Sequence, residues 1–263
     1  MNPHLIKYVV PFMLLFLLTD CSGDPVKQET SVKEKKTVKK KSKKKAKKKK
    51  KDIVITNENA VDFFTEYGKK NPETVIRLSS SFGNIDIELF TNTPIHRANI
   101  IYLTKRKYFD LTQFYRVSKN FVLQAGNSDE TDTQAMRAKI GHYTLPAEFR
   151  EANRHFYGSV AMARRYDKNP TKRSSPYEFY INLGRKFSAA EMKGLMRETG
   201  LEYPVEQKNR YINEGGNPSL DLQHTVVGRV IRGMDVALKI NEVKVDGTEW
   251  PLNEIPITVR VVR

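Results

Sequence analysis

Residues 114–127 read Phe-Tyr-Arg-Val-Ser-Lys-Asn-Phe-Val-Leu-Gln-Ala-Gly-Asn, and this stretch decides the fold. It holds two short runs rich in aromatic and β-branched residues, Gln113–Val117 and Phe121–Gln124. Runs of this length and composition are typical of β-strands. The stretch therefore predicts two short strands that follow each other closely in the chain.

Outward from this stretch, the hydrophobic pattern predicts a mainly β domain. Residues 75–79 and 85–89 alternate around Gly83-Asn84 and predict a β-hairpin. Residues 94–107 have the apolar spacing of an amphipathic helix, and Ser188 with Glu191 predicts a capped helix over 188–200. Further strands are expected at 158–163, 178–182, 224–230 and 257–262, with a second helix at 234–241. Many short strands with two substantial helices suggest a barrel or sandwich with capping helices.

Five segments, in order, resemble the signature motifs of the cyclophilins. They are Phe114–Val117, Phe121–Asn127, Gly158–Arg164, Glu178–Ile181 and Leu220–Gly228. The chain departs from the family pattern at Tyr115, Ala125 and Asn127, and has Pro176-Tyr177-Glu178 where Gly-Ser-Gln is usual. Residues 143–149 and the insert at 184–218 look like bacterial lipoprotein members of the family. The resemblance covers 74–263 and implies a closed, antiparallel, eight-stranded β-barrel capped by two helices, with a helical insert.

This resemblance implies a peptidyl-prolyl cis/trans isomerase. An X-Pro amide prefers trans by only about 0.5–1 kcal/mol, yet it interconverts in tens to hundreds of seconds. A catalyst needs no nucleophile, metal or cofactor, but must favour the twisted amide, whose prolyl nitrogen regains a lone pair. A fixed cation that donates a hydrogen bond to that nitrogen would do so. Arg116 occupies the motif position for this donor; the alternative is an arginine in a surface ion pair.

The resemblance also places residues around the bound proline. Lining an apolar pocket is expected of Phe121, Val122, Tyr180 and Leu220, each of which could instead be a core residue. The expected substrate-binding set is Phe114, Phe121, Val122, Gln124, Ala163, Arg164, Glu178, Tyr180, Leu220 and His224.

Several members of this set have more specific expected roles. Gln124 would bond the substrate backbone or orient Arg116, and Ala163 and Arg164 would contact the residue before proline through main-chain groups. His224 would donate to a substrate carbonyl at the pocket edge. A carboxylate replaces the usual amide at Glu178, and pairing with Arg116 would partly neutralise the proposed catalytic charge.

Residues 1–21 read as an export signal. Lys7 is the only charge before the apolar stretch 8–18, which is too short to span a bilayer as a helix. The segment ends in Leu18-Thr19-Asp20-Cys21, which resembles the lipobox of bacterial lipoproteins and implies lipidation of Cys21. Asp20 is a departure, and an ordinary signal peptide or uncleaved anchor is the alternative. A single cysteine excludes an intrachain disulfide and a cysteine-rich metal site.

The basic charge of the chain is concentrated in one segment. Residues 33–51 hold 14 lysines and one glutamate, so this run carries +13 of the formal net charge of +16. Residues 22–51 cannot pack a core and are expected to be a disordered, Lys-rich tether. The lysines could contact anionic lipid headgroups or act as a solvated spacer, whereas an export signal argues against a nucleic-acid arm. Residues 52–73 are expected to form a helical lead-in.

Three functions remain open from the sequence. The first is an isomerase, monomeric and lipid-anchored at a bacterial cell envelope, on the periplasmic face or cell surface, that acts on proline-containing exported proteins and assists their folding. The second is a non-catalytic module of the same fold that holds peptides or a partner. In the third, the lysine tether is the functional part and binds anionic surfaces.

Overall fold

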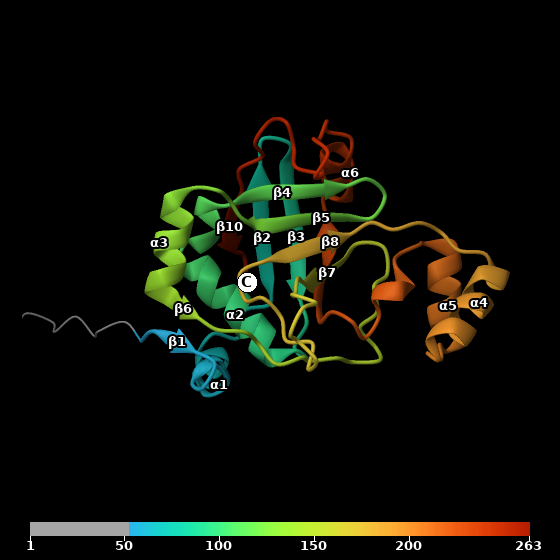
Figure 1. Ribbon diagram of the computed structural model, residues 1–263, viewed down its shortest axis with the longest axis horizontal. Coiled ribbons are helices and arrows are strands. Elements are labelled where there is room, and N and C mark those ends of the chain that lie inside the picture. The colour runs from blue at the N-terminus through green and yellow to red at the C-terminus, as the bar shows by residue number, and fades with distance from the viewer. Residues whose placement is uncertain (1–52) are drawn as a thin grey trace, which may run out of the picture. The chain divides into compact units, whose positions relative to one another are not determined.

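The computed structural model describes residues 53–263, in which eight strands form one antiparallel sheet with the order β10-β2-β3-β9-β7-β8-β5-β4. These strands are β2 (Val75–Ser80), β3 (Gly83–Leu89), β4 (Gln113–Ser118), β5 (Val122–Asn127), β7 (Ser159–Met162), β8 (Phe179–Asn182), β9 (Val226–Arg232) and β10 (Thr258–Val261). Two short strands, β1 (Ile55–Thr56) and β6 (Gly141–His142), pair with each other. Figure 1 shows β4, β5 and β8 crossing in front of β2 and β3, as strands of a strongly curved sheet do.

Helices cover the ends of this sheet. Their bounds are α1 (Ala60–Lys70), α2 (Pro94–Lys105), α3 (Thr131–Ile140), α4 (Ala189–Thr199), α5 (Val205–Asn213) and α6 (Met234–Asn241), with 3₁₀ turns η1 (Tyr108–Leu111) and η2 (Pro218–Leu220). The two expected capping helices are α2, which packs against β10, and α6, which packs against β3, β4 and β5. On the outside of α2, the Phe63 and Phe64 rings of α1 meet Tyr102 edge-on, at centroid distances of 5.2 and 5.9 Å.

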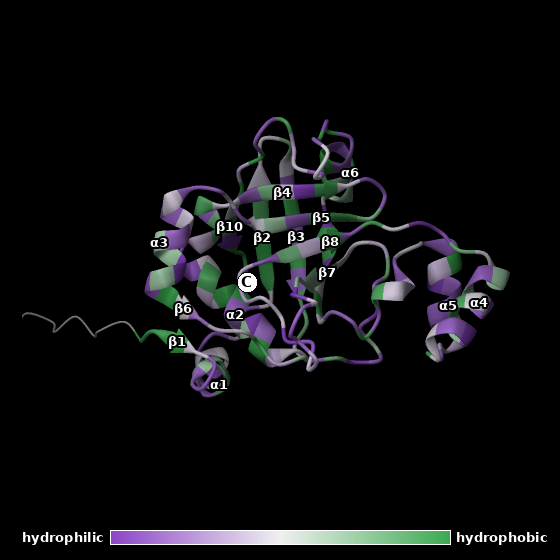
Figure 2. Ribbon diagram, in the orientation of Figure 1, coloured by the Kyte–Doolittle hydropathy of each residue, from purple (hydrophilic) through white to green (hydrophobic). Residues whose placement is uncertain are grey.

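Neighbouring residues in the central strands face opposite sides of the sheet. In β8, Phe179 and Ile181 belong to the main core, whereas Tyr180 lies in a second, smaller cluster with Ala161 and Val226. The two-residue period of a strand separates these two sets. Figure 2 shows the same alternation of hydrophobic and hydrophilic residues along β4, β5 and β8.

The expected closed barrel is wrong, because the sheet is a half-barrel. Its edge strands β4 and β10 share no ladder, and a single bridge joins Gln113 to Pro256 just before β10. Only two backbone hydrogen bonds flank that bridge, from Phe114 to Ile255 and from Ile257 to Thr112. Pairing does not continue towards β10, because the Thr112 N–H donates to the Phe109 carbonyl within the chain and the Val259 N–H donates to the Asp110 side chain instead of to β4.

The insert leaves and rejoins the sheet domain at two glycines. Gly184 and Gly216 approach so closely that a Cβ on Gly184 would lie 2.2 Å from the Gly216 carbonyl carbon. Beyond this neck, α4 and α5 project to the right in Figure 1 and share a small core that includes Met192 and Tyr211. The expected capping box is confirmed, since the Ser188 and Glu191 side chains bond each other's backbone N–H groups.

The predicted export signal, Cys21 and the tether at 22–51 lie outside the described residues. Among residues 53–263, none of the helices combines the length and apolar character needed to cross a bilayer.

Candidate active site

A row of cross-strand neighbours builds the candidate site on the outer face of the sheet. The strand register places Arg116 beside Gln124, Gln124 beside Tyr180, and Tyr180 beside Ala161. Arg116, Gln124 and Tyr180 of this row line a cavity of about 130 Å³. The cavity is lined by Arg116, Phe121, Val122, Gln124, Ala163, Arg164, Tyr166, Tyr180, Leu220 and His224. Nine residues expected from the sequence thus meet in one place, together with Tyr166, which was not expected.

Phe114 does not belong to this cavity, contrary to expectation. It is fully buried in the main core opposite Ala125, while Arg116 lies opposite Gln124. Residues two apart in a strand normally share a face, but Tyr115 is an extra residue without a partner between them. This β-bulge sends the Phe114 and Arg116 side chains to opposite sides of the sheet.

The Arg116 guanidinium is held by Glu249. Arg116 Nε donates to Glu249 Oε2 at 2.7 Å, and the guanidinium carbon lies 6.0 Å from the centre of the Phe121 ring. Within residues 53–263 this is the only hydrogen bond of the Arg116 side chain, so Glu249, and not Gln124, orients it. The sequence carries no local signal for this pair, because the two residues are 133 positions apart.

Glu178 does not face Arg116, which corrects a second expectation. Its carboxylate accepts hydrogen bonds from the Arg137 guanidinium at 3.3 Å and from the Tyr115 hydroxyl at 3.4 Å. Arg137 belongs to α3 and also stacks on the Tyr177 ring, 5.0 Å from its centre. Glu178 therefore joins α3 to the sheet outside the cavity, and the neutralisation of Arg116 comes from Glu249 instead.

His224 is a neutral imidazole with both ring nitrogens engaged. Nδ1 lies 3.1 Å from the Met162 carbonyl oxygen, which can only accept, so Nδ1 carries the proton. Nε2 then accepts the Tyr166 hydroxyl at 2.8 Å. Burial lowers the pKa of His224 to about 4. The expected donation from His224 to a substrate carbonyl is therefore not available at Nε2, and the exposed Tyr166 stands at that edge.

The main chain at Ala163 is also engaged. Its N–H donates to the Glu178 carbonyl at 3.0 Å, and its carbonyl accepts from the Ser175 N–H at 2.8 Å. The Arg164 side chain reaches the segment before β9, where Nε donates to the Gln223 carbonyl at 2.6 Å, and its guanidinium stacks 4.1 Å from the Tyr166 ring centre. In this arrangement the Ala163 N–H therefore cannot donate to the substrate residue before proline, which was one of the expected main-chain contacts.

A buried hydrogen-bond chain supports the cavity floor from below. The Tyr180 hydroxyl lies 2.9 Å from His155 Nε2, and His155 Nδ1 lies 3.0 Å from Asp221 Oδ1. Asp221 Oδ2 accepts the hydroxyls of Tyr203 at 2.9 Å and of Tyr211 at 2.6 Å. Because Tyr211 belongs to α5, the insert is tied through polar groups to a residue of the candidate site.

A Ser–His–Glu trio resembles a hydrolase triad but has a structural role. His96 Nε2 lies 3.0 Å from Ser174 Oγ, and Nδ1 lies 2.6 Å from Glu148 Oε2. Ser174 is 1% exposed, so no substrate reaches it. The Glu148 carboxylate also accepts the backbone N–H groups of Ile95 and His96, and it therefore caps the first turn of α2.

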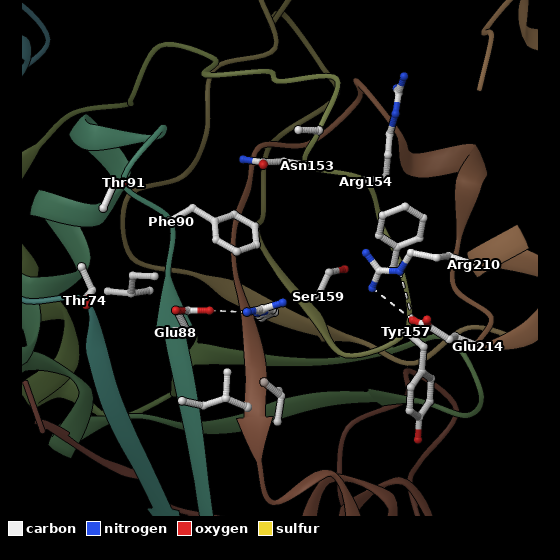
Figure 3. A pocket seen from close by; sticks show the side chains of 16 residues that line it. Thr74, Glu88, Phe90, Thr91, Asn153, Arg154, Tyr157, Ser159, Arg210 and Glu214 are labelled. Carbon is white, nitrogen blue, oxygen red and sulfur yellow. Dashed lines mark hydrogen bonds and ion pairs between the residues drawn. The ribbon is translucent and has the colours of Figure 1, made fainter. Parts of the chain in front are cut away.

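A second cavity, of about 840 Å³, lies between the sheet and the insert (Figure 3). Four of its charged groups form two ion pairs, since Arg229 bonds Glu88 at 2.8 Å and Arg210 bonds Glu214 at 3.1 Å, while Arg154 donates to the Gln207 side chain at 3.1 Å. Ser159 lies between these two pairs in Figure 3. The groups do not converge on a common point, in contrast to the row around Arg116.

Fold and site together define a cyclophilin-like protein. A family model described as cyclophilin type peptidyl-prolyl cis-trans isomerase/CLD matches residues 75–261. The chain therefore belongs to the cyclophilin-type peptidyl-prolyl cis/trans isomerases.

Curated relatives agree with this assignment. The peptidyl-prolyl cis-trans isomerase CYP18-2 of Arabidopsis thaliana is 27% identical over 183 residues, which cover 69% of this chain and 89% of the relative. A Staphylococcus aureus protein assigned by name to the same activity is 28% identical over 186 residues, which cover 70% and 89%.

Solved structures show the same fold. A cyclophilin-type isomerase of Cryptosporidium parvum superposes with a TM-score of 0.51 at 18% identity, covering 73% of this chain and 98% of that one. The same protein in the presence of the dipeptide Ala-Pro gives a TM-score of 0.50 at 18% identity, covering 72% and 99%.

Proposed function

We propose that the cavity around Arg116 isomerises X-Pro bonds in exported polypeptides and so assists their folding. One observation carries this proposal: the strand register gathers a fixed guanidinium, the Gln124 amide and an apolar floor in one cavity of about 130 Å³. A proline ring seated on Val122, Phe121 and Tyr180 would be held still while the residue before it turns. The Arg116 Nη groups can then donate to the prolyl nitrogen as it loses amide resonance.

The magnitudes agree with such a mechanism. The amide barrier of roughly 18–20 kcal/mol arises from C–N resonance, which is lost in the twisted state. One preorganised donor is worth about 2.7–4 kcal/mol of transition-state stabilisation. Arg116 would therefore supply a large single share of the catalysis, and the fixed ring and excluded water would supply the rest.

We place this activity at a bacterial cell envelope, on a chain anchored through Cys21. The support is the export signal and lipobox-like sequence at 1–21, and the lysine run at 33–51 adds affinity for anionic surfaces in this proposal. We also propose a monomer that belongs to the lipoprotein branch of the family.

A non-catalytic binding module is the second candidate. The observation that favours it is the Glu249 carboxylate bonded to Arg116, because a paired guanidinium has less charge to offer a twisted amide.

Isomerisation of a short X-Pro peptide by the full chain separates the two functions. We expect clear acceleration by the parent and a loss on the order of a hundredfold for Arg116→Ala. Arg229→Ala is a control, since Arg229 is likewise paired with a glutamate but lies outside this cavity. A folded parent no faster than the uncatalysed reaction with several residues before proline would favour the binding module.

A further inference from the structure

We propose that Glu249 is a positioning residue for Arg116, and that the turn 246–250 is built to hold it in place. This inference rests on the proposed function of Arg116. The Glu249 carboxylate has two separate anchors on β4: Oε2 accepts Arg116 Nε at 2.7 Å, and Oε1 accepts Ser118 Oγ at 2.6 Å. The carboxylate is therefore fixed on both sides and cannot follow the guanidinium if it swings.

The backbone of the same residue is joined to β4 as well. The Val117 N–H donates to the Glu249 carbonyl at 2.8 Å, so one residue meets three consecutive positions of the strand. On the neighbouring position, the Trp250 ring packs against Tyr115, with centroids 5.9 Å apart. The turn thus contacts four residues in a row, Tyr115 to Ser118, and Arg116 is inside this set.

The turn itself is ordered before any substrate arrives. Asp246 Oδ1 accepts the Thr248 hydroxyl at 2.7 Å and the N–H groups of Thr248 and Trp250 at 2.7 and 3.0 Å. The Thr248 hydroxyl, and then the two backbone N–H groups, lower the pKa of Asp246. Glu249 has φ +67°, in the left-handed region that non-glycine residues rarely adopt. Such a conformation is maintained only where surrounding contacts over-determine it, and it often marks a functional site.

The geometry explains how a carboxylate can assist a catalytic cation. Glu249 accepts from Nε of Arg116, a residue that lines the cavity, and within residues 53–263 the two Nη groups keep their N–H donors free of hydrogen bonds. Fixing the guanidinium in advance removes the entropy of a long side chain from the barrier. Partial neutralisation of the Arg116 charge by Glu249 would raise the barrier, whereas fixing the guanidinium lowers it. Whether removal of the Glu249 side chain lowers or raises kcat therefore decides which effect is larger.

Two substitutions separate geometry from charge. Glu249→Gly removes the side chain at a position where glycine fits the backbone without strain. Glu249→Gln keeps an oxygen that can accept from Arg116 Nε but removes the charge. On an X-Pro peptide, with kcat and KM measured separately by NMR exchange, we expect Glu249→Gly to lower kcat roughly tenfold with KM nearly unchanged. The kcat of Glu249→Gln should stay within about threefold of the parent value.

Glu242→Gln is the matched control. It removes the exposed ion pair with Lys119, which follows β4, and should not change kcat or KM.

A second measurement does not depend on activity. The Arg116 Nε–H resonance, assigned by its absence in Arg116→Lys, should be slow to exchange with solvent in the parent and fast in Glu249→Gly, because its acceptor is lost. An unchanged or raised kcat in Glu249→Gly, or a Glu249→Gln variant as impaired as Glu249→Gly, would overturn the proposal. Fast exchange already in the parent would do so too. If the parent is inactive but the resonance shows the expected protection, the positioning stands and the proposed isomerase function fails.

Discussion

The buried imidazole of His224 links the candidate site to acidic pH. Its folded-state pKa is about 4, lowered first by burial and further by the nearby His155, Arg164 and Lys172. An unfolded histidine has a pKa near 6.5. Between these values the unfolded chain binds a proton that the folded chain does not, so folding stability decreases as pH falls from about 6.5 towards 4.

We expect this one residue to cost roughly 2 kcal/mol of unfolding free energy at about pH 4.5 relative to pH 7. Urea unfolding followed by the fluorescence of Trp250, the single tryptophan, measures it as the difference between the parent and His224→Gln. An NMR titration of the imidazole checks the cause directly. A midpoint near 6.5 in the folded protein would contradict the assigned burial and the neutral tautomer.

Single residues also show where sequence motifs stop being informative. The sequence motifs correctly predicted that Arg116, Gln124 and Tyr180 lie together, because the register between strands follows from the alternation of buried side chains. It failed for Phe114, because the bulge at Tyr115 reverses the alternation and leaves no signal in the pattern. It could not find Glu249, whose partner is set by the path of a distant turn.

At the scale of elements, Asp221 joins the insert to the sheet. Its carboxylate, 1% exposed, accepts four hydrogen bonds, from the His155 backbone N–H and ring and from the hydroxyls of Tyr203 and Tyr211. Burial raises the pKa of both tyrosines, and the Asp221 charge adds to the effect, so they stay neutral donors. The insert core is small, and this polar centre supplies part of its attachment.

We therefore predict that Asp221→Ala destabilises the fold by about 3–5 kcal/mol, since it leaves several buried donors without an acceptor. Tyr211→Phe removes one donor and should cost only about 1 kcal/mol. Urea unfolding gives both values, and limited proteolysis within residues 184–216 should quicken in Asp221→Ala. A loss below about 1 kcal/mol for Asp221→Ala would show that water replaces these bonds and that the centre is not structural.

The elements differ in how far the sequence predicted them. The hairpin β2–β3, α2, α4 and α6 were predicted because apolar spacing or a capping box marks each of them. Helix α3 was missed, since it buries only Thr133 and Ile140 and is held instead by Arg137 against Tyr108 and Tyr177. The prediction of a closed barrel was wrong because a count of strands does not reveal that the chain segments of β4 and β10 meet only at the bridge between Gln113 and Pro256.

On the scale of the whole molecule, the net positive charge and the candidate active site belong to separate segments of the chain. Residues 33–51 carry +13 of the net +16, so the remaining 244 residues are close to neutral. The candidate site draws all its residues from 116–224, with Glu249 behind Arg116. Catalysis on a small soluble peptide and attraction to a charged surface should therefore be independent properties of this chain.

Deletion of residues 33–51 tests this separation. We expect the variant to isomerise a soluble X-Pro peptide at the parent rate, since no residue of the cavity is removed. Its binding to vesicles that contain anionic lipid should fall by at least a hundredfold, because each lysine near such a surface contributes about 1 kcal/mol. Both chains should begin at Ser22, so that the predicted lipid at Cys21 does not dominate the measurement.

Neutral vesicles and a raised salt concentration serve as controls, since both should weaken binding of the parent to the level of the variant. Equal binding of the two chains to anionic vesicles would make the lysine run a spacer, and slower isomerisation by the variant would show that the segment contributes to the site.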